Sequence, residues 1–149
     1  MKKSTKLYNV IFPVWLIGIA VPWVWLVVIP GNFLIDSLVL LAGMYALKIS
    51  AKKEFYKKHI LKIYLFGMLS DFIGSLFMFV AMFLLDVGRM GDELYLTIPG
   101  VLLSAGMIFI FNYFITFKKI EYKERLKLSI IFAVVTAPYT FLIPTSWIY

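Results

Sequence analysis

The sequence predicts an all-α protein, a single domain of five membrane-spanning helices over residues 1–149, and three observations carry this prediction. Hydrophobic residues make up 62% of the chain, whereas soluble domains are about 45–50% apolar. These residues fall into runs close to the ~20 residues that a helix needs to cross a bilayer. Lysine and arginine gather in short segments between alternate runs, as they do on the cytoplasmic side of membrane proteins.

The predicted spans cover about residues 10–29, 33–49, 63–85, 94–117 and 128–143. The first follows MKKSTK and resembles a signal peptide, but its apolar run continues to Ile29, so we expect an uncleaved span. Pro30 and Gly31 are expected to end it. Asn32 would then cap the second span and place Asp36 in its first turn, where the helix dipole favours an acid.

Charged and turn-forming residues separate the remaining spans. The basic segment 48–59 is expected to prolong the second helix beyond the membrane. Glycines and charges in 86–93 mark an exposed turn after the third span, and Pro144 is expected to end the fifth. No stretch is long and polar enough to form a separate soluble domain.

The distribution of basic residues predicts how the chain is threaded. Fourteen of the 15 lysines and arginines precede the first span or lie in segments 48–62 and 118–127, and only Arg89 lies on the other side. By the positive-inside rule, the N-terminus is cytoplasmic and the C-terminus is outside. We therefore expect a multi-pass protein of the cell membrane, and the composition favours a bacterial inner (plasma) membrane.

The net charge of +7 would favour a nucleic-acid partner in a soluble protein, but these charges flank apolar spans, so no nucleic acid is expected. The expected partners are the lipid bilayer and its anionic head groups, which attract basic residues by ~1 kcal/mol each. The candidate head-group contacts are Lys52, Lys53, Lys118 and Lys119. The alternative is that these lysines serve only as the topology signal.

Two pairs of segments resemble each other within the chain. VLLAGM (39–44) recurs as VLLSAGM (101–107), and KKEFYKKHI (52–60) recurs as KKIEYKERL (118–126). One interpretation is that the second and third spans, and the fourth and fifth, are two copies of one helical hairpin in the same orientation. The alternative is that any two spans flanking a basic loop look alike.

Asp71, inside the third span, is the main candidate functional residue. Gly67, Asp71 and Ser75 share one helix face, and Ser70 and Gly74 lie beside it. Small residues let a neighbouring helix approach closely, and a charge at mid-membrane costs ~2.5–3.5 kcal/mol. Asp71 is therefore expected to face protein and to bind a proton or cation, or else to form a purely structural hydrogen bond.

Residues at matching depth extend this candidate site. At ~1.5 Å per residue, Asn112 and Thr136 are expected to meet Asp71 in one layer on the cytoplasmic side, although Asn112 alone is more typical of helix–helix contacts. The candidate binding set is Asp71, Ser70, Ser75, Asn112 and Thr136. Asp36 and Asp86 are expected to form an acidic outer mouth that attracts cations, or simply to be solvated helix ends.

Several classes of site find no support in the sequence. The chain has no cysteine, and its one histidine, His59, falls in a basic segment, so neither a metal nor a cofactor is expected. No catalytic motif is present. A paired-aspartate hydrolase needs a second acid at the depth of Asp71, and both Asp36 and Asp86 are expected near the other side. We therefore do not expect an enzyme.

These observations favour a transport-related protein that binds or moves a cation or small solute at Asp71. The alternative is a non-catalytic accessory: a subunit, chaperone or immunity-type protein that binds another membrane protein. A third hypothesis, an enzyme acting on lipid, requires a polar pocket that opens to the inner leaflet. Because the bundle is small, we also expect a homo-oligomer or a larger membrane complex.

Overall fold

The computed structural model describes residues 22–85 and 93–142. The elements in order are α2 (Pro22–Ala46), α3 (Lys52–Leu85), α4 (Glu93–Phe111), the π-helical turn η1 (Asn112–Thr116), α5 (Tyr122–Val135) and the 3-10 turn η2 (Tyr139–Leu142). Four segments of the described chain are long and apolar enough to cross a membrane: Trp25–Ala46, Lys52–Leu84, Tyr95–Thr116 and Tyr122–Leu142. The predictions of an all-α fold and a multi-pass membrane protein are thus confirmed at this level.

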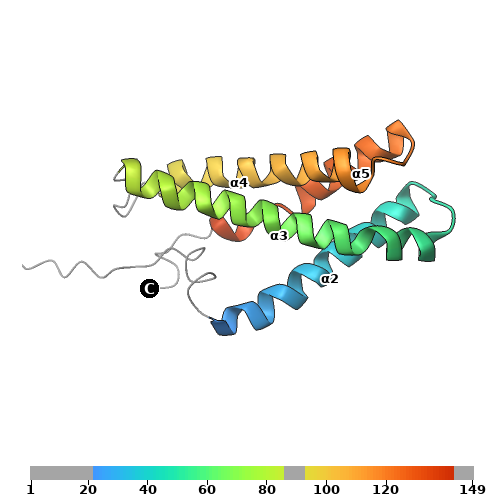
Figure 1. The fold of residues 1–149 in the computed structure, drawn as a ribbon, viewed down its shortest axis with the longest axis horizontal. Helices are drawn as coiled ribbons and strands as arrows, with labels where there is room; N and C mark the ends of the chain where they lie inside the picture. The colour runs from blue at the N-terminus through green and yellow to red at the C-terminus, as the bar shows by residue number, and fades with distance from the viewer. Residues whose placement is uncertain (1–21, 86–92, 143–149) are drawn as a thin grey trace, which may run out of the picture.

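The helices form two hairpins, α2–α3 and α4–α5, whose turns lie at the same end of the molecule (Figure 1). α3 and α4 run antiparallel, side by side, whereas α2 crosses α3 and diverges from it toward Pro22 (Figure 1). Every lysine and arginine of the described chain lies in 48–62 or 118–127, at the end that holds both turns. We call this the basic end.

The expected helix break at Pro30 and Gly31 is wrong. α2 continues through Pro30 without interruption, because apolar sequence on both sides supports a membrane helix and such helices tolerate proline. Residues 22–29, assigned to a first span, belong to the same helix as the second. Asn32 is therefore not a cap, and Asp36 lies in the middle of α2 rather than in its first turn.

The basic segment 48–59 prolongs α3 and not α2, contrary to the expectation. α2 ends at Ala46, and the chain reverses through Lys48 and Ala51, whose φ angles are 53° and 52°. α3 then begins at Lys52. His59 consequently lies within a helix, buried, with its ring 4.2 Å from that of Phe55.

The second hairpin is less regular than the first. The fourth span matches its expected range closely, since α4 and η1 together cover Glu93–Thr116. The fifth was expected to be continuous over 128–143, but α5 ends at Val135. Pro138 has no N–H to continue the helix, and the Tyr139 hydroxyl donates instead to the freed carbonyl of Val134. Pro144 lies outside the described residues.

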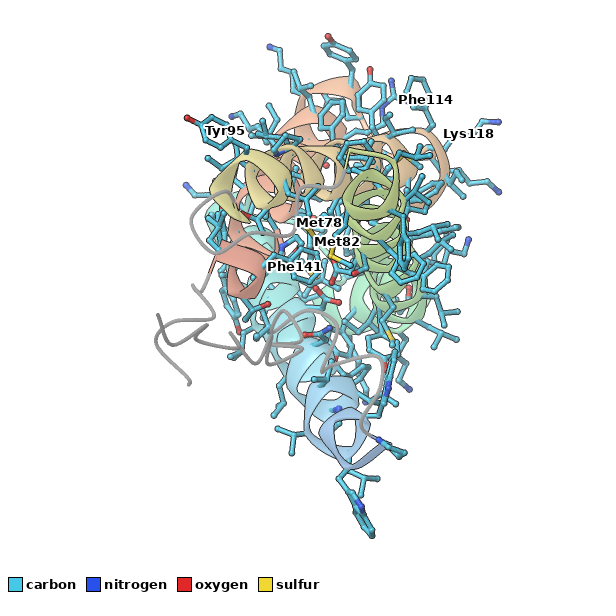
Figure 2. All side chains as sticks on the ribbon, turned by 90° about the vertical axis from the view of Figure 1, so that its left-hand side faces the viewer. Met78, Met82, Tyr95, Phe114, Lys118 and Phe141 are labelled. Atoms are coloured by element: carbon cyan, nitrogen blue, oxygen red, sulfur yellow. The ribbon has the colours of Figure 1, made fainter. Side chains whose placement is uncertain are left out.

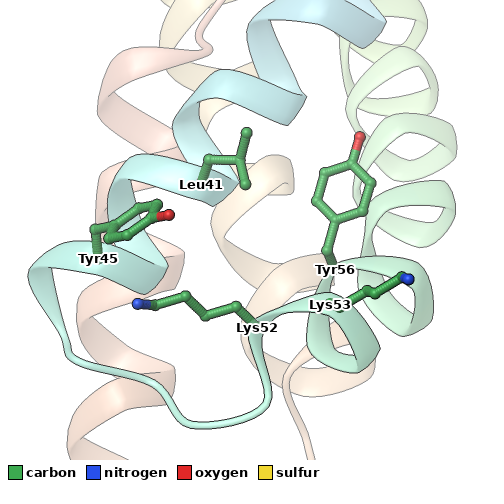
Figure 3. Close-up of a pocket in the computed structure, with 5 residues that line it drawn as sticks. All are labelled: Leu41, Tyr45, Lys52, Lys53 and Tyr56. Atoms are coloured by element: carbon green, nitrogen blue, oxygen red, sulfur yellow. The ribbon is translucent and has the colours of Figure 1, made fainter.

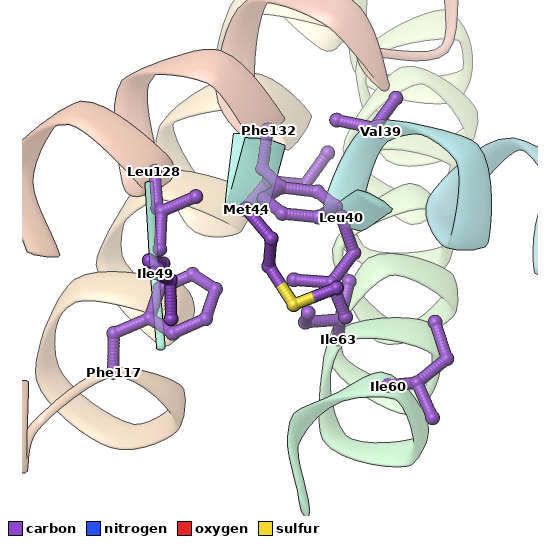
Figure 4. Packing of buried hydrophobic residues seen from close by; sticks show 10 residues of the cluster. Val39, Leu40, Met44, Ile49, Ile60, Ile63, Phe117, Leu128 and Phe132 are labelled. Atoms are coloured by element: carbon purple, nitrogen blue, oxygen red, sulfur yellow. The ribbon is translucent and has the colours of Figure 1, made fainter. Parts of the chain in front are cut away.

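Two apolar clusters occupy the two ends of the bundle. The larger, at the basic end, comprises Val39, Leu40, Met44, Ile49, Ile60, Ile63, Ile108, Phe117, Leu128 and Phe132 (Figure 4). The smaller, at the opposite end, has Met78 and Leu96 as its buried members, with Ala81, Met82 and Phe141 packed against them. Figure 2 shows Met78, Met82 and Phe141 beside one another between the helices. Between the two clusters lies a layer of small and polar side chains.

Candidate functional site

Asp71 lies about one turn before Gly74, where α3 and α4 pack closely together. A Cβ added to Gly74 would lie 2.9 Å from the Gly100 carbonyl oxygen and 3.1 Å from the Ser104 Cβ. Small residues at this crossing allow the two backbones to come together. At this separation the Ser104 hydroxyl donates a hydrogen bond of 2.7 Å to Asp71 Oδ1. The expectation that Asp71 faces a neighbouring helix through a small-residue surface is confirmed.

Asp36 approaches the same face of α3 from the other side. Its Oδ2 atom lies 3.6 Å from the position that a Cβ on Gly67 would occupy, and Gly67 precedes Asp71 by one turn. This contact at Gly67 places the Asp36 carboxylate beside the helix face that carries Asp71. Asp36 is 6% exposed. It is therefore not part of an outer mouth, and the expectation of no second acid near Asp71 was wrong because α2 begins earlier than expected.

The two carboxylates differ in how they are satisfied. Asp71 accepts the Ser104 hydrogen bond, but no hydrogen bond within 22–85 and 93–142 reaches the Asp36 carboxylate. Two carboxylates close together in a low dielectric repel each other strongly when both are charged. Within the described residues, the two acids therefore differ in that one carboxylate has a hydroxyl donor and the other has none.

Ser70 and Ser75 line the surroundings of Asp71 without binding its carboxylate. The Ser70 hydroxyl donates to the Phe66 carbonyl at 2.7 Å, and that of Ser75 donates to the Asp71 carbonyl at 2.8 Å. Both side chains are buried. Their hydroxyl oxygens keep lone pairs and can still accept a hydrogen bond or coordinate a cation.

Asn112 and Thr136 do not join this site through any hydrogen bond of the described chain. Asn112 Nδ2 donates to the Ile108 carbonyl at 3.0 Å, and Thr136 Oγ1 donates to the Phe132 carbonyl at 2.8 Å. The prediction that Asn112 and Thr136 lie at the same depth as Asp71 was wrong. It counted the rise along the third span from Lys62, whereas α3 begins at Lys52. Ser104, which the prediction missed, is the α4 residue opposite Asp71.

The other candidate residues have separate positions. Lys53, Lys118 and Lys119 are exposed at the basic end, and Lys52 is half-buried with its ammonium 4.0 Å from the centre of the Tyr45 ring. Asp86 lies outside the described residues. Within the described part of the chain, no group of three His, Cys, Asp or Glu side chains is placed to hold a metal ion.

No known protein family, curated protein or solved structure matches the chain.

Proposed function

We propose that this protein is a small transport-related membrane protein that binds a proton or a small monovalent cation between Asp36 and Asp71. The observation that carries the proposal is the pair of carboxyl groups contributed by two helices in the middle of the bundle. One has a single hydroxyl partner, and the other has none among the described residues. Intramembrane acids of this kind typically mark ion or proton pathways.

The tight packing around the pair favours a small cargo. Gly100 leaves no room on α4, since a Cβ there would lie 2.6 Å from the Met78 Sδ atom. The two depressions described on the surface lie at the basic end, away from the pair. Two carboxylates and the Ser104 hydroxyl form an all-oxygen ligand set, which suits a proton or a hard cation.

The two apolar clusters favour entry of the proton or cation to Asp36 and Asp71 from the end opposite the lysines. Within residues 22–85 and 93–142, the cluster between the pair and the basic end has ten buried members, and the smaller cluster has two. A shorter apolar barrier costs less to open or hydrate. Met78, which packs on Gly100, is fully buried on this shorter route.

We further propose that the basic end faces the cytoplasm, in accordance with the positive-inside rule. The chain contains no cysteine, so single cysteines report orientation without background. Cysteines placed at Lys53 and Lys119 should both react with an impermeant maleimide only from the cytoplasmic side. A cysteine at Ser4 should label from that same side if a fifth span precedes α2, and from the opposite side if none does.

The direct test is flux into proteoliposomes that contain purified protein. Parent, Asp36→Asn and Asp71→Asn are compared under proton, Na⁺ and K⁺ gradients, with the exposed Glu54→Gln as the matched control. Each aspartate variant should lose about 100-fold of a proton flux, the scale of one positioned acid–base group, and Glu54→Gln should match the parent. Absence of flux in the parent, or equal flux in all four proteins, overturns the proposal.

We do not propose an enzyme, although a pair of aspartates also forms the dyad of some hydrolases. A dyad must receive a substrate bond between its carboxylates. The close approach of Gly74 to Gly100 closes the α4 side of the pair. Hydrolysis of a peptide or lipid ester by the parent, lost in Asp71→Asn, would overturn this exclusion.

An accessory role is the second candidate, and the first turns of α2 support it. Trp23, Leu26 and Val27 are 77%, 67% and 72% exposed and, at spacings i, i+3 and i+4, share one face of α2. The helix diverges from α3 in this region (Figure 1). Such a helix can pack against another membrane protein. Purification in a mild detergent should then return a stoichiometric partner that is lost on Trp23→Ala and Val27→Ala substitution.

A further inference from the structure

A depression of about 320 Å³ lies between α2 and α3 at the basic end (Figure 3). Its lining combines an apolar floor with two positive charges and consists of Leu41, Tyr45, Lys52, Lys53 and Tyr56. The side chains of Lys52 and Lys53 extend toward opposite sides of it (Figure 3). The depression lies outside the Asp36–Asp71 site and is not used by the proposed transport function.

Contacts between the helices hold the walls of this depression in place. The Lys52 ammonium lies 4.0 Å from the centre of the Tyr45 ring, a cation–π contact that joins α3 to α2. The Tyr56 hydroxyl and the Ser37 hydroxyl form a hydrogen bond of 2.9 Å between the same helices. The Lys52 charge is therefore held beside an ordered apolar surface, and Lys53 follows it as an exposed residue in the first turn of α3.

An exposed apolar stripe leads from the depression along α2. Leu34, Leu38, Leu41 and Tyr45 recur at helical spacing and are 61%, 64%, 39% and 66% exposed. From Leu34 to Tyr45 the stripe extends over ~16 Å of helix. It runs from the level of the lysines toward the middle of the span, which is the direction that a lipid tail takes from its head group.

We propose that this depression binds one anionic phospholipid, with its phosphate between Lys52 and Lys53 and one acyl chain along the α2 stripe. Charge complementarity supports this occupant, because both charged side chains in the lining are positive. A second depression at the same end contains Glu121 and Glu124 beside its lysines. It therefore lacks the uniform positive charge that favours a phosphate.

The test is native mass spectrometry of the detergent-solubilised full chain, titrated with phosphatidylglycerol, phosphatidylcholine or inorganic phosphate. The parent should retain one phosphatidylglycerol at concentrations where phosphatidylcholine and phosphate do not bind. The double variant Lys52→Gln/Lys53→Gln should weaken phosphatidylglycerol binding by roughly 30-fold, the combined effect of two basic contacts. The matched control Lys118→Gln/Lys119→Gln removes the same charge from the same end and should weaken binding less than about threefold.

Two further variants separate a specific site from a general charge effect. Lys52→Arg/Lys53→Arg keeps the charges and should bind phosphatidylglycerol like the parent. Leu38→Asn places a polar group on the stripe and should weaken binding of long-chain phosphatidylglycerol more than that of a short-chain form. Equal losses in the two lysine-to-glutamine pairs, equal binding of phosphatidylcholine, or displacement of the lipid by inorganic phosphate overturns the proposal.

Discussion

The two hairpins have the same orientation, but they contribute different side chains to the candidate site. The α2–α3 hairpin supplies both carboxylates, on two regular helices. The α4–α5 hairpin supplies only the Ser104 hydroxyl, and its backbone is interrupted by η1 and by the break after Val135. If the hairpins derive from one repeat, Asp71 corresponds to Ala137, at that break. The α2–α3 hairpin thus carries both acidic side chains of the candidate site. The α4–α5 hairpin contributes a closely packed glycine, Gly100, and one hydrogen-bond donor, Ser104.

The contact between the hairpins at Gly74 should be the most sensitive position. Gly74→Ala places a methyl group 2.9 Å from the Gly100 carbonyl oxygen, so α3 and α4 must separate. We expect a loss of about 1–3 kcal/mol in the free energy of unfolding, measured by denaturant titration in micelles. The control is Gly106→Ala, where no atom lies within 4 Å and a gain of up to about 1 kcal/mol is expected. Equal effects at the two glycines would contradict a close α3–α4 contact.

The partnered and unpartnered carboxylates should separate in a double-mutant cycle. Asp71→Ala and Ser104→Ala should show a coupling of about 1–2 kcal/mol in unfolding free energy, because each removes the other's hydrogen bond. Asp36→Asn and Ser104→Ala should be additive within about 0.5 kcal/mol. A coupling of Ser104 to Asp36 as large as that to Asp71 would show that the hydroxyl serves both acids.

Each hairpin contains a hydrogen bond from a tyrosine hydroxyl, and the two bonds should differ in how much they stabilise the protein. Tyr56→Phe removes the part-buried hydrogen bond to Ser37 between α2 and α3 and should cost about 1 kcal/mol of unfolding free energy. Tyr139→Phe removes an exposed bond to the Val134 carbonyl, which water can replace, and should cost less than about 0.5 kcal/mol. The same denaturant titration measures both, and the reverse order would contradict a stronger tie in the first hairpin.

Composition and run length were sufficient to predict the helical, multi-pass fold, and small residues at helical spacing predicted that Asp71 faces a neighbouring helix. They failed at Pro30, because a turn signal that ends a soluble helix does not end one supported by apolar sequence on both sides. Because of this wrong boundary, Asp36 was predicted at a helix end, whereas it lies in the middle of α2. The sequence analysis therefore missed it as a second acid near Asp71. In the sequence, Ser104 is the residue inserted when VLLAGM recurs as VLLSAGM. This insertion was the one feature of the sequence that could have drawn attention to Ser104. Which helix packs against Asp71, however, cannot be derived from the spacing of residues along a helix.

The uninterrupted passage of α2 through Pro30 has a mechanical consequence. Proline leaves the carbonyl one turn earlier, at Leu26, without its usual N–H partner, so the helix is most compliant there. The diverging arm ahead of it is apolar and exposed, and Asp36 follows ~9 Å along the axis. A lateral force on that arm, from bilayer tension or a bound neighbour, would therefore bend α2 ahead of Asp36, while the Ser37–Tyr56 hydrogen bond holds the following part of α2 on α3.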